Sequence, residues 1–148
     1  MIILINFSNL FSGSQRQARD YLTKTFYYFN KPIANEYLER AMQHLVKLVE
    51  RLDGWVTHGV KYARVMALLN KPLKSVEDAF QRAISHCKEN QYIIKAREQL
   101  GCYYLARNMD EIAESQFQLA IEIGKERPCR AWVAQYGLKF ISSRNQRR

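Results

Sequence analysis

Residues 96–120 read AREQLGCYYLARNMDEIAESQFQLA, and this stretch carries the pattern that best predicts the fold. Its apolar residues recur at intervals of three and four positions, which is the period of an α-helix, and the strict alternation of a strand is absent. Asn108 interrupts the pattern, so the stretch is predicted to form two helices joined by a short turn. Small residues at Gly101 and Ala113 would let these helices cross closely, with large side chains such as Phe117 filling the space around the crossing.

This spacing resembles the tetratricopeptide repeat, a unit of two antiparallel helices. The stretch matches the repeat at six diagnostic positions, which are Leu100, Gly101, Tyr104, Ala113, Phe117 and Ala120. Two weaker units precede it, one at Val76, Phe80 and Ala83 and one at Ala34, Leu38 and Ala41. The resemblance implies an all-α fold, an α-solenoid of about three antiparallel helix pairs with a C-terminal capping helix over 129–142. An unrelated helical bundle is the alternative, because Ala, Leu and Phe recur at helical spacing there as well.

Helix-breaking residues divide the rest of the chain in the same way. Asn30, Asn70 and Asn108 recur at intervals of 40 and 38 residues, and an Asn just beyond a helix can adopt the left-handed conformation that ends it. Pro soon after such a residue suits the first turn of the next helix. The predicted helices span roughly 14–28, 32–51, 55–69, 73–88, 91–107, 110–126 and 129–142.

Length and composition fit one helical domain. The chain has 148 residues, of which 47% are hydrophobic, and only six Gly and three Pro are present, too few for the dense turns of a sandwich or barrel. We expect an N-terminal arm over 1–13, a helical repeat domain over 14–142 and a basic, solvated tail over 143–148. The net charge of +9 describes partners and solubility and says nothing about fold.

The chemistry expected of the side chains is limited. The three cysteines, Cys87, Cys102 and Cys129, form no Cys-x-x-Cys pair, so they are predicted to be reduced residues of a cytoplasmic protein. Each of the three histidines falls in a different predicted helix, and no phosphate loop or nucleophile motif is present. We therefore expect no metal, no cofactor and no enzymatic activity. The apolar start of the chain is too short to span a bilayer, so no membrane partner is expected.

The resemblance also implies a partner-binding groove, because the first helix of each tetratricopeptide pair faces the concave surface. The positions that would line it are Arg16, Arg19, Thr23 and Phe26, then His58, Lys61, Val65 and Leu68, then Lys95, Glu98, Cys102 and Leu105. The first two positions of each unit are mostly basic and the later two mostly apolar, which suits an acidic, amphipathic segment of a partner protein. Asn is absent from these positions, so the carboxylate clamp of chaperone-binding family members is not inferred.

The leading functional hypothesis is a protein-interaction module, either an adaptor or a chaperone-like protein. In size and repeat count the chain resembles the small three-repeat chaperones of bacterial secretion systems, although its basic charge departs from them. Nucleic-acid binding is an alternative, since the net charge favours phosphate and the aromatic run 27–29 lies beside Lys24 and Lys31. A further alternative is a structural subunit that self-associates through Trp55 or Trp132.

Overall fold

The computed structural model describes residues 35–147, and within them it is all-helical, with no strand. The all-α prediction is thereby confirmed, while the predicted helix over 14–28 and the arm over 1–13 lie outside the described residues. The elements are α2 (Asn35–Val49), α3 (Gly54–Leu68), α4 (Leu73–His86), α5 (Asn90–Ala106), α6 (Asp110–Ile123), a short 3₁₀ turn (Pro128–Ala131) and α7 (Trp132–Gln146).

The Asn residues end their helices as the sequence predicted. Asn70 follows α3 with φ of 55°, and Asn108 follows α5 with φ of 60°. In both turns the next backbone N–H reaches back over the last helical turn, to the carbonyl oxygen of Met66 in the first (3.0 Å) and of Tyr104 in the second (2.9 Å). This six-to-one hydrogen bond is the Schellman cap, which satisfies carbonyl groups that a helix end leaves unpaired.

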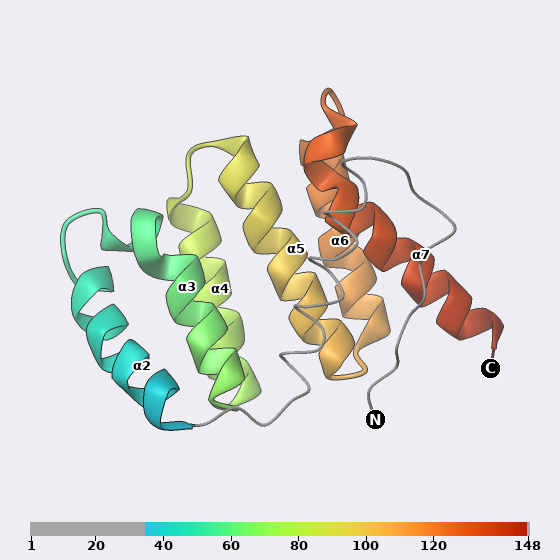
Figure 1. The fold of residues 1–148 in the computed structure, drawn as a ribbon. Coiled ribbons are helices and arrows are strands. Elements are labelled where there is room, and N and C mark those ends of the chain that lie inside the picture. Colours follow the sequence, from blue (N-terminus) through green and yellow to red (C-terminus); the bar gives the residue numbers. More distant parts are fainter. Residues whose placement is uncertain (1–34, 148) are drawn as a thin grey trace.

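The helices form a row in which each packs on the next along the chain (Figure 1). The closest associations join α2 to α3, α3 to α4, and α5 to α6, with α7 packed on α6. In addition, α3 contacts α5, and α5 contacts α7, so contacts also join alternate helices. The helix α5 consequently has neighbours on several sides.

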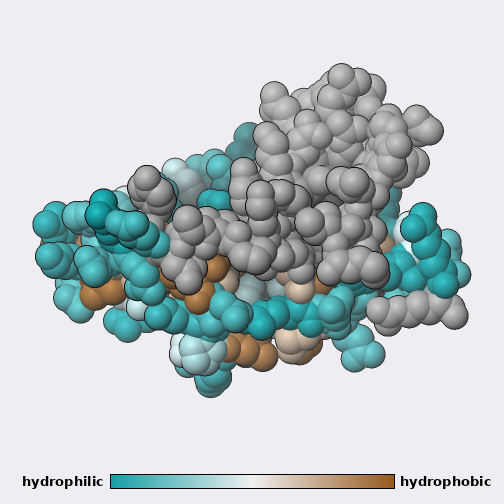
Figure 2. Space-filling view, turned by 60° about the horizontal axis from the view of Figure 1, so that its bottom comes forward, coloured by the Kyte–Doolittle hydropathy of each residue, from teal (hydrophilic) through white to brown (hydrophobic). Residues whose placement is uncertain are grey.

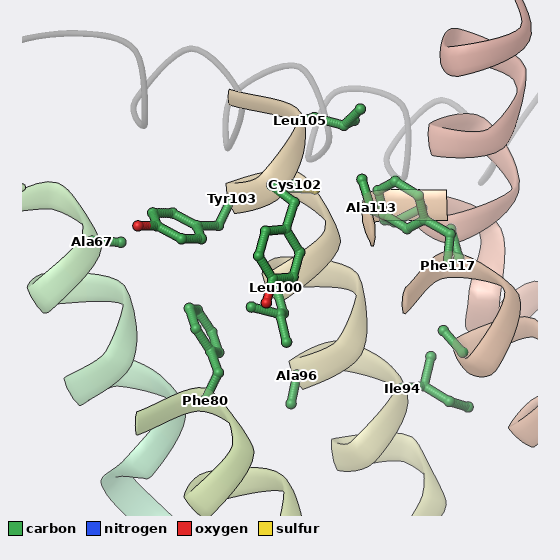
Figure 3. Close-up of a cluster of buried hydrophobic side chains, with 14 of the residues drawn as sticks. Ala67, Phe80, Ile94, Ala96, Leu100, Cys102, Tyr103, Leu105, Ala113 and Phe117 are labelled. Atoms are coloured by element: carbon green, nitrogen blue, oxygen red, sulfur yellow. The ribbon is translucent and has the colours of Figure 1, made fainter. Parts of the chain in front are cut away.

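The hydrophobic core is centred on α5, which contributes more buried side chains than any other described helix. Figure 3 shows Phe80 of α4 and Tyr103 of α5 beside Ala67 of α3, and the two rings lie 6.4 Å apart between centroids. On the other side of α5, Phe117 of α6 is fully buried. Burial of large rings on both sides of α5 makes this helix the main contributor to hydrophobic stabilisation.

The Phe117 ring lies between two glycines, Gly101 and Gly137, which approach opposite edges of the ring. A Cβ atom at Gly101 of α5 or at Gly137 of α7 would come within 2.5 Å of ring carbons of Phe117. The close helix crossing predicted for Gly101 is therefore present, and Gly137 adds a second crossing that the sequence interpretation did not identify. Because no side chain larger than hydrogen fits at either position, these glycines set how closely α5 and α7 approach α6.

The C-terminal segment differs from the prediction. The helix α7 continues to Gln146, four residues beyond the predicted end at 142, so residues 143–146 are helical, and all of them but Arg144 are exposed. Arg144 is largely buried and forms an ion pair with Asp110 at the start of α6, with its Nε 3.1 Å from the carboxylate. A local sequence pattern could not show this contact, because Asp110 lies 34 residues away in sequence.

Candidate partner-binding surface

The structure brings the predicted groove residues of two units onto neighbouring helices. Of the twelve, Arg16, Arg19, Thr23 and Phe26 lie outside the described residues. The others lie on two helices that contact each other, with His58, Lys61, Val65 and Leu68 on α3 and Lys95, Glu98, Cys102 and Leu105 on α5.

These eight residues differ in exposure. Lys61 and Lys95 are exposed, and the other three positions on α3 are half-buried. In contrast Glu98, Cys102 and Leu105 are buried, with exposed fractions of 3%, 0% and 1%. These three side chains are buried in the structure and are not accessible to a partner in this conformation. The accessible remainder, called the α3–α5 strip below, consists of His58, Lys61, Val65, Leu68 and Lys95.

Glu98 has a structural environment that explains its burial. Its Oε2 accepts a hydrogen bond of 2.7 Å from the backbone N–H of Ala134, in the first turn of α7. A carboxyl at this place satisfies an N–H that the helix start leaves unpaired. Burial raises the pKa of Glu98 to about 8, against the opposing effects of the Ala134 N–H and of Lys95. Most Glu98 side chains are therefore uncharged at neutral pH, and Glu98 adds little negative charge beside the lysines of the strip.

The cations around the α3–α5 strip have no acidic partner within the part of the chain that the structure describes. Among residues 35–147 no carboxylate forms an ion pair with Lys61, Arg64 or Lys95, although five other basic residues are paired. The helix α3 itself contains no Asp or Glu. Arg64 is half-buried and was not among the predicted site residues. The signal that could have identified it is its position, because Arg64 stands where the tetratricopeptide pattern has a small glycine.

The described thiols are poor nucleophiles. Burial raises the pKa of the Cys102 thiol well above its usual value and, to a smaller extent, that of Cys87. A thiol held protonated in this way acts as a small apolar residue. Cys129 contributes no described side chain. Within 35–147 no three His, Cys, Asp or Glu side chains lie close enough to hold a metal ion.

On the face that Figure 2 shows, the described residues are mostly hydrophilic, with small hydrophobic patches between them. None of the helices in the described part is long and apolar enough to cross a membrane. No protein-family model matches the chain, and no curated protein or solved structure matches it. What the described residues define by themselves is an all-helical protein with an unpaired basic strip.

Proposed function

We propose that this protein is a non-enzymatic protein-interaction module, adaptor or chaperone-like, built from stacked tetratricopeptide-like helix pairs. In this proposal the α3–α5 strip binds an acidic or amphipathic segment of a partner protein. Two features support the stacking and one supports the binding.

The first support for stacking is the pattern of helix contacts. Each helix packs on its neighbour, and α3, α5 and α7 also contact one another in order, as the first helices of successive pairs do in a solenoid. A row built in this way keeps one set of helices along one surface. The residues of α3 and α5 can then act together on an extended partner.

The second support is a side-chain contact that recurs between successive turns. Arg107, at the end of α5, donates from Nη2 to Oδ1 of Asn70 in the preceding turn (3.0 Å). Arg144 of α7 donates from Nη1 to Oδ1 of Asn108 (3.5 Å). The two pairs span 37 and 36 residues, so the same contact repeats at the spacing of the helix pairs. Such repetition is expected of structural repeats and not of an unrelated bundle.

The observation that carries the binding proposal is the set of unpaired cations beside half-buried apolar side chains. Lys61 and Lys95 are exposed without an acidic partner among the described residues, and Val65 and Leu68 lie half-buried on the same helix as Lys61. Opposite charge on a partner would speed and orient the encounter, while apolar contacts would supply most of the affinity.

Charge reversal tests this proposal. We expect the Lys61→Glu, Lys95→Glu double variant to lose the partner protein that the wild type retains from a nuclease-treated lysate of the source cell at moderate salt. The matched control is Lys47→Glu, Lys88→Glu, which makes the same charge change at exposed sites outside the strip. Helical circular dichroism should be the same in all three proteins.

Two outcomes would contradict the proposal. Equal retention by both double variants would show that the strip is not the site. Recovery that consists of nucleic acid and disappears with nuclease and salt would assign the basic surface to phosphate binding instead.

A further inference from the structure

A hollow of about 790 Å³ opens beside the turn between α2 and α3, away from the α3–α5 strip. Three helices and the turn contribute its walls. Its walls include Val46 and Val49 of α2, Leu52 of the turn, Trp55 of α3, and Arg82 and His86 of α4. None of the five residues of the α3–α5 strip lines the hollow, although His58 of the strip is a helical neighbour of Trp55 and Tyr62.

Three aromatic rings and a guanidinium form one wall of the hollow. The Cζ of Arg82 lies 4.5 Å from the centre of the Trp55 ring, and Tyr62 contacts the same ring edge-on at 5.5 Å. The His86 ring lies 6.4 Å from the Trp55 ring. Nδ1 of His86 is 2.8 Å from the carbonyl oxygen of Arg82 and must donate to it, which leaves Nε2 for another partner.

Arg82 has no acidic partner among residues 35–147. Glu50 and Asp53 also line the hollow, but they are exposed and form no ion pair with Arg82. A guanidinium stacked on an indole keeps the N–H groups at its edge, and these match a carboxylate in two parallel hydrogen bonds. The stacking also holds the group in one place, so less freedom is lost when it binds.

An apolar side chain at the hollow, that of Leu52, is exposed to solvent. Leu52 is 94% exposed, next to Asp53, whose φ of 58° shapes the turn. Val46 and Val49 line the wall beneath. A partner that carries an apolar residue close to its acidic one would cover Leu52 while its carboxylate reaches Arg82.

We propose that this hollow is a second binding site, which takes an acidic side chain and an adjacent apolar residue from a partner polypeptide. Arg82 binds the carboxylate, and Leu52 with Val46 and Val49 contacts the apolar residue. The site shares no residue with the α3–α5 strip, so variants can test the two separately.

A random peptide library displayed on phage, selected against the intact chain, tests this site. We expect one class of enriched peptides that carries Asp or Glu next to a large apolar residue. This class should lose binding to Arg82→Gln and to Leu52→Ser, and should keep binding to the Lys61→Glu, Lys95→Glu variant. Enriched peptides that depend only on Lys61 and Lys95 would support the strip and overturn the hollow. Absence of enrichment would overturn the hollow as well.

A peptide of that class then allows a direct measurement. In a Trp132→Phe background Trp55 is the only tryptophan of the chain, so its emission reports on the hollow. We expect a saturable change in emission, with affinity lowered about tenfold or more by Arg82→Lys, which keeps the charge and loses the paired hydrogen bonds. Arg127→Lys, at an exposed site away from the hollow, is the control. Equal affinity for Arg82→Lys and the wild type would overturn the proposed role of Arg82.

Discussion

The carboxyl of Glu98 joins α5 to α7 through the Ala134 N–H, at a distance of 2.7 Å. Its burial raises its pKa to about 8, whereas the same residue titrates near 4.5 when it is solvated. Between these two pH values the folded chain binds more protons than the unfolded chain at this site. Stability contributed by Glu98 is therefore complete below about pH 4.5 and is lost as the pH rises towards 8.

Glu98→Gln should remove this pH dependence. The amide keeps an oxygen that can accept from Ala134 and has no charge to bury, so the variant should exceed the wild type in unfolding free energy at alkaline pH. Each unit of pKa shift corresponds to about 1.4 kcal/mol, so the difference should reach a few kcal/mol. Urea unfolding of both proteins at about pH 5 and about pH 9 measures it. The exposed Glu126→Gln is the control, and a Glu98→Gln variant with the same pH dependence as the wild type would refute the assignment.

At the scale of the helices, local chemistry made the boundaries predictable. Asn70 and Asn108 end helices by their own left-handed conformation, which depends on the residues next to them. The roles of Gly137 and Arg144 could not be predicted, because their partners Phe117 and Asp110 belong to another helix. The helical periodicity of a sequence shows which small residues share one face of a helix. It does not show which aromatic ring of another helix packs against them.

The same limit explains the result for the candidate site. The repeat resemblance predicted which positions of α3 and α5 share a surface, and those on α3 remain accessible in part or in full. On α5 the positions Glu98, Cys102 and Leu105 are buried, because α5 is the central helix of the core. Whether a side chain is exposed depends on how the neighbouring helices pack against it, and the sequence of one helix does not show this. That no carboxylate of residues 35–147 pairs with Lys61 or Lys95 likewise became visible only with the neighbouring helices in place.

Gly137→Ala tests the crossing between α6 and α7. Replacing Gly by Ala inside a helix usually stabilises it by about 0.5–1 kcal/mol, but a methyl group here would press on the Phe117 ring. Overpacking of this kind costs about 1–3 kcal/mol, so we expect net destabilisation in thermal or urea unfolding. Phe117→Leu makes room, and the double variant should therefore be more stable than the sum of the two single changes predicts. Strict additivity, or a stabilising Gly137→Ala, would contradict the proposed crossing.

Across the whole molecule the row arrangement produces a gradient of burial. Within residues 35–147 the helix α5 has neighbours in α3, α4, α6 and α7, whereas α2 packs chiefly on α3. Ten side chains or glycines of α5 are buried, and in α2, among the residues whose side chains are described, Val49 is the buried one. When each helix contacts mainly its neighbours, the free energy of unfolding is close to a sum of contributions from single helix pairs and their interfaces. Helices with fewer buried side chains should therefore need less free energy to unfold locally.

Hydrogen exchange of the intact chain should report this gradient. Amides of α5 and α6 should exchange slowest, by global unfolding, while those of α2 exchange faster through local opening that leaves the Phe117 region packed. Mass spectrometry of peptic fragments after timed deuteration resolves the helices. Gly137→Ala should accelerate exchange in α6 and α7 more than in α2, since its effect begins at the Phe117 contact. If α2 were protected as strongly as α5, the molecule would open as one cooperative unit, and the proposed stack of semi-independent helix pairs would be wrong.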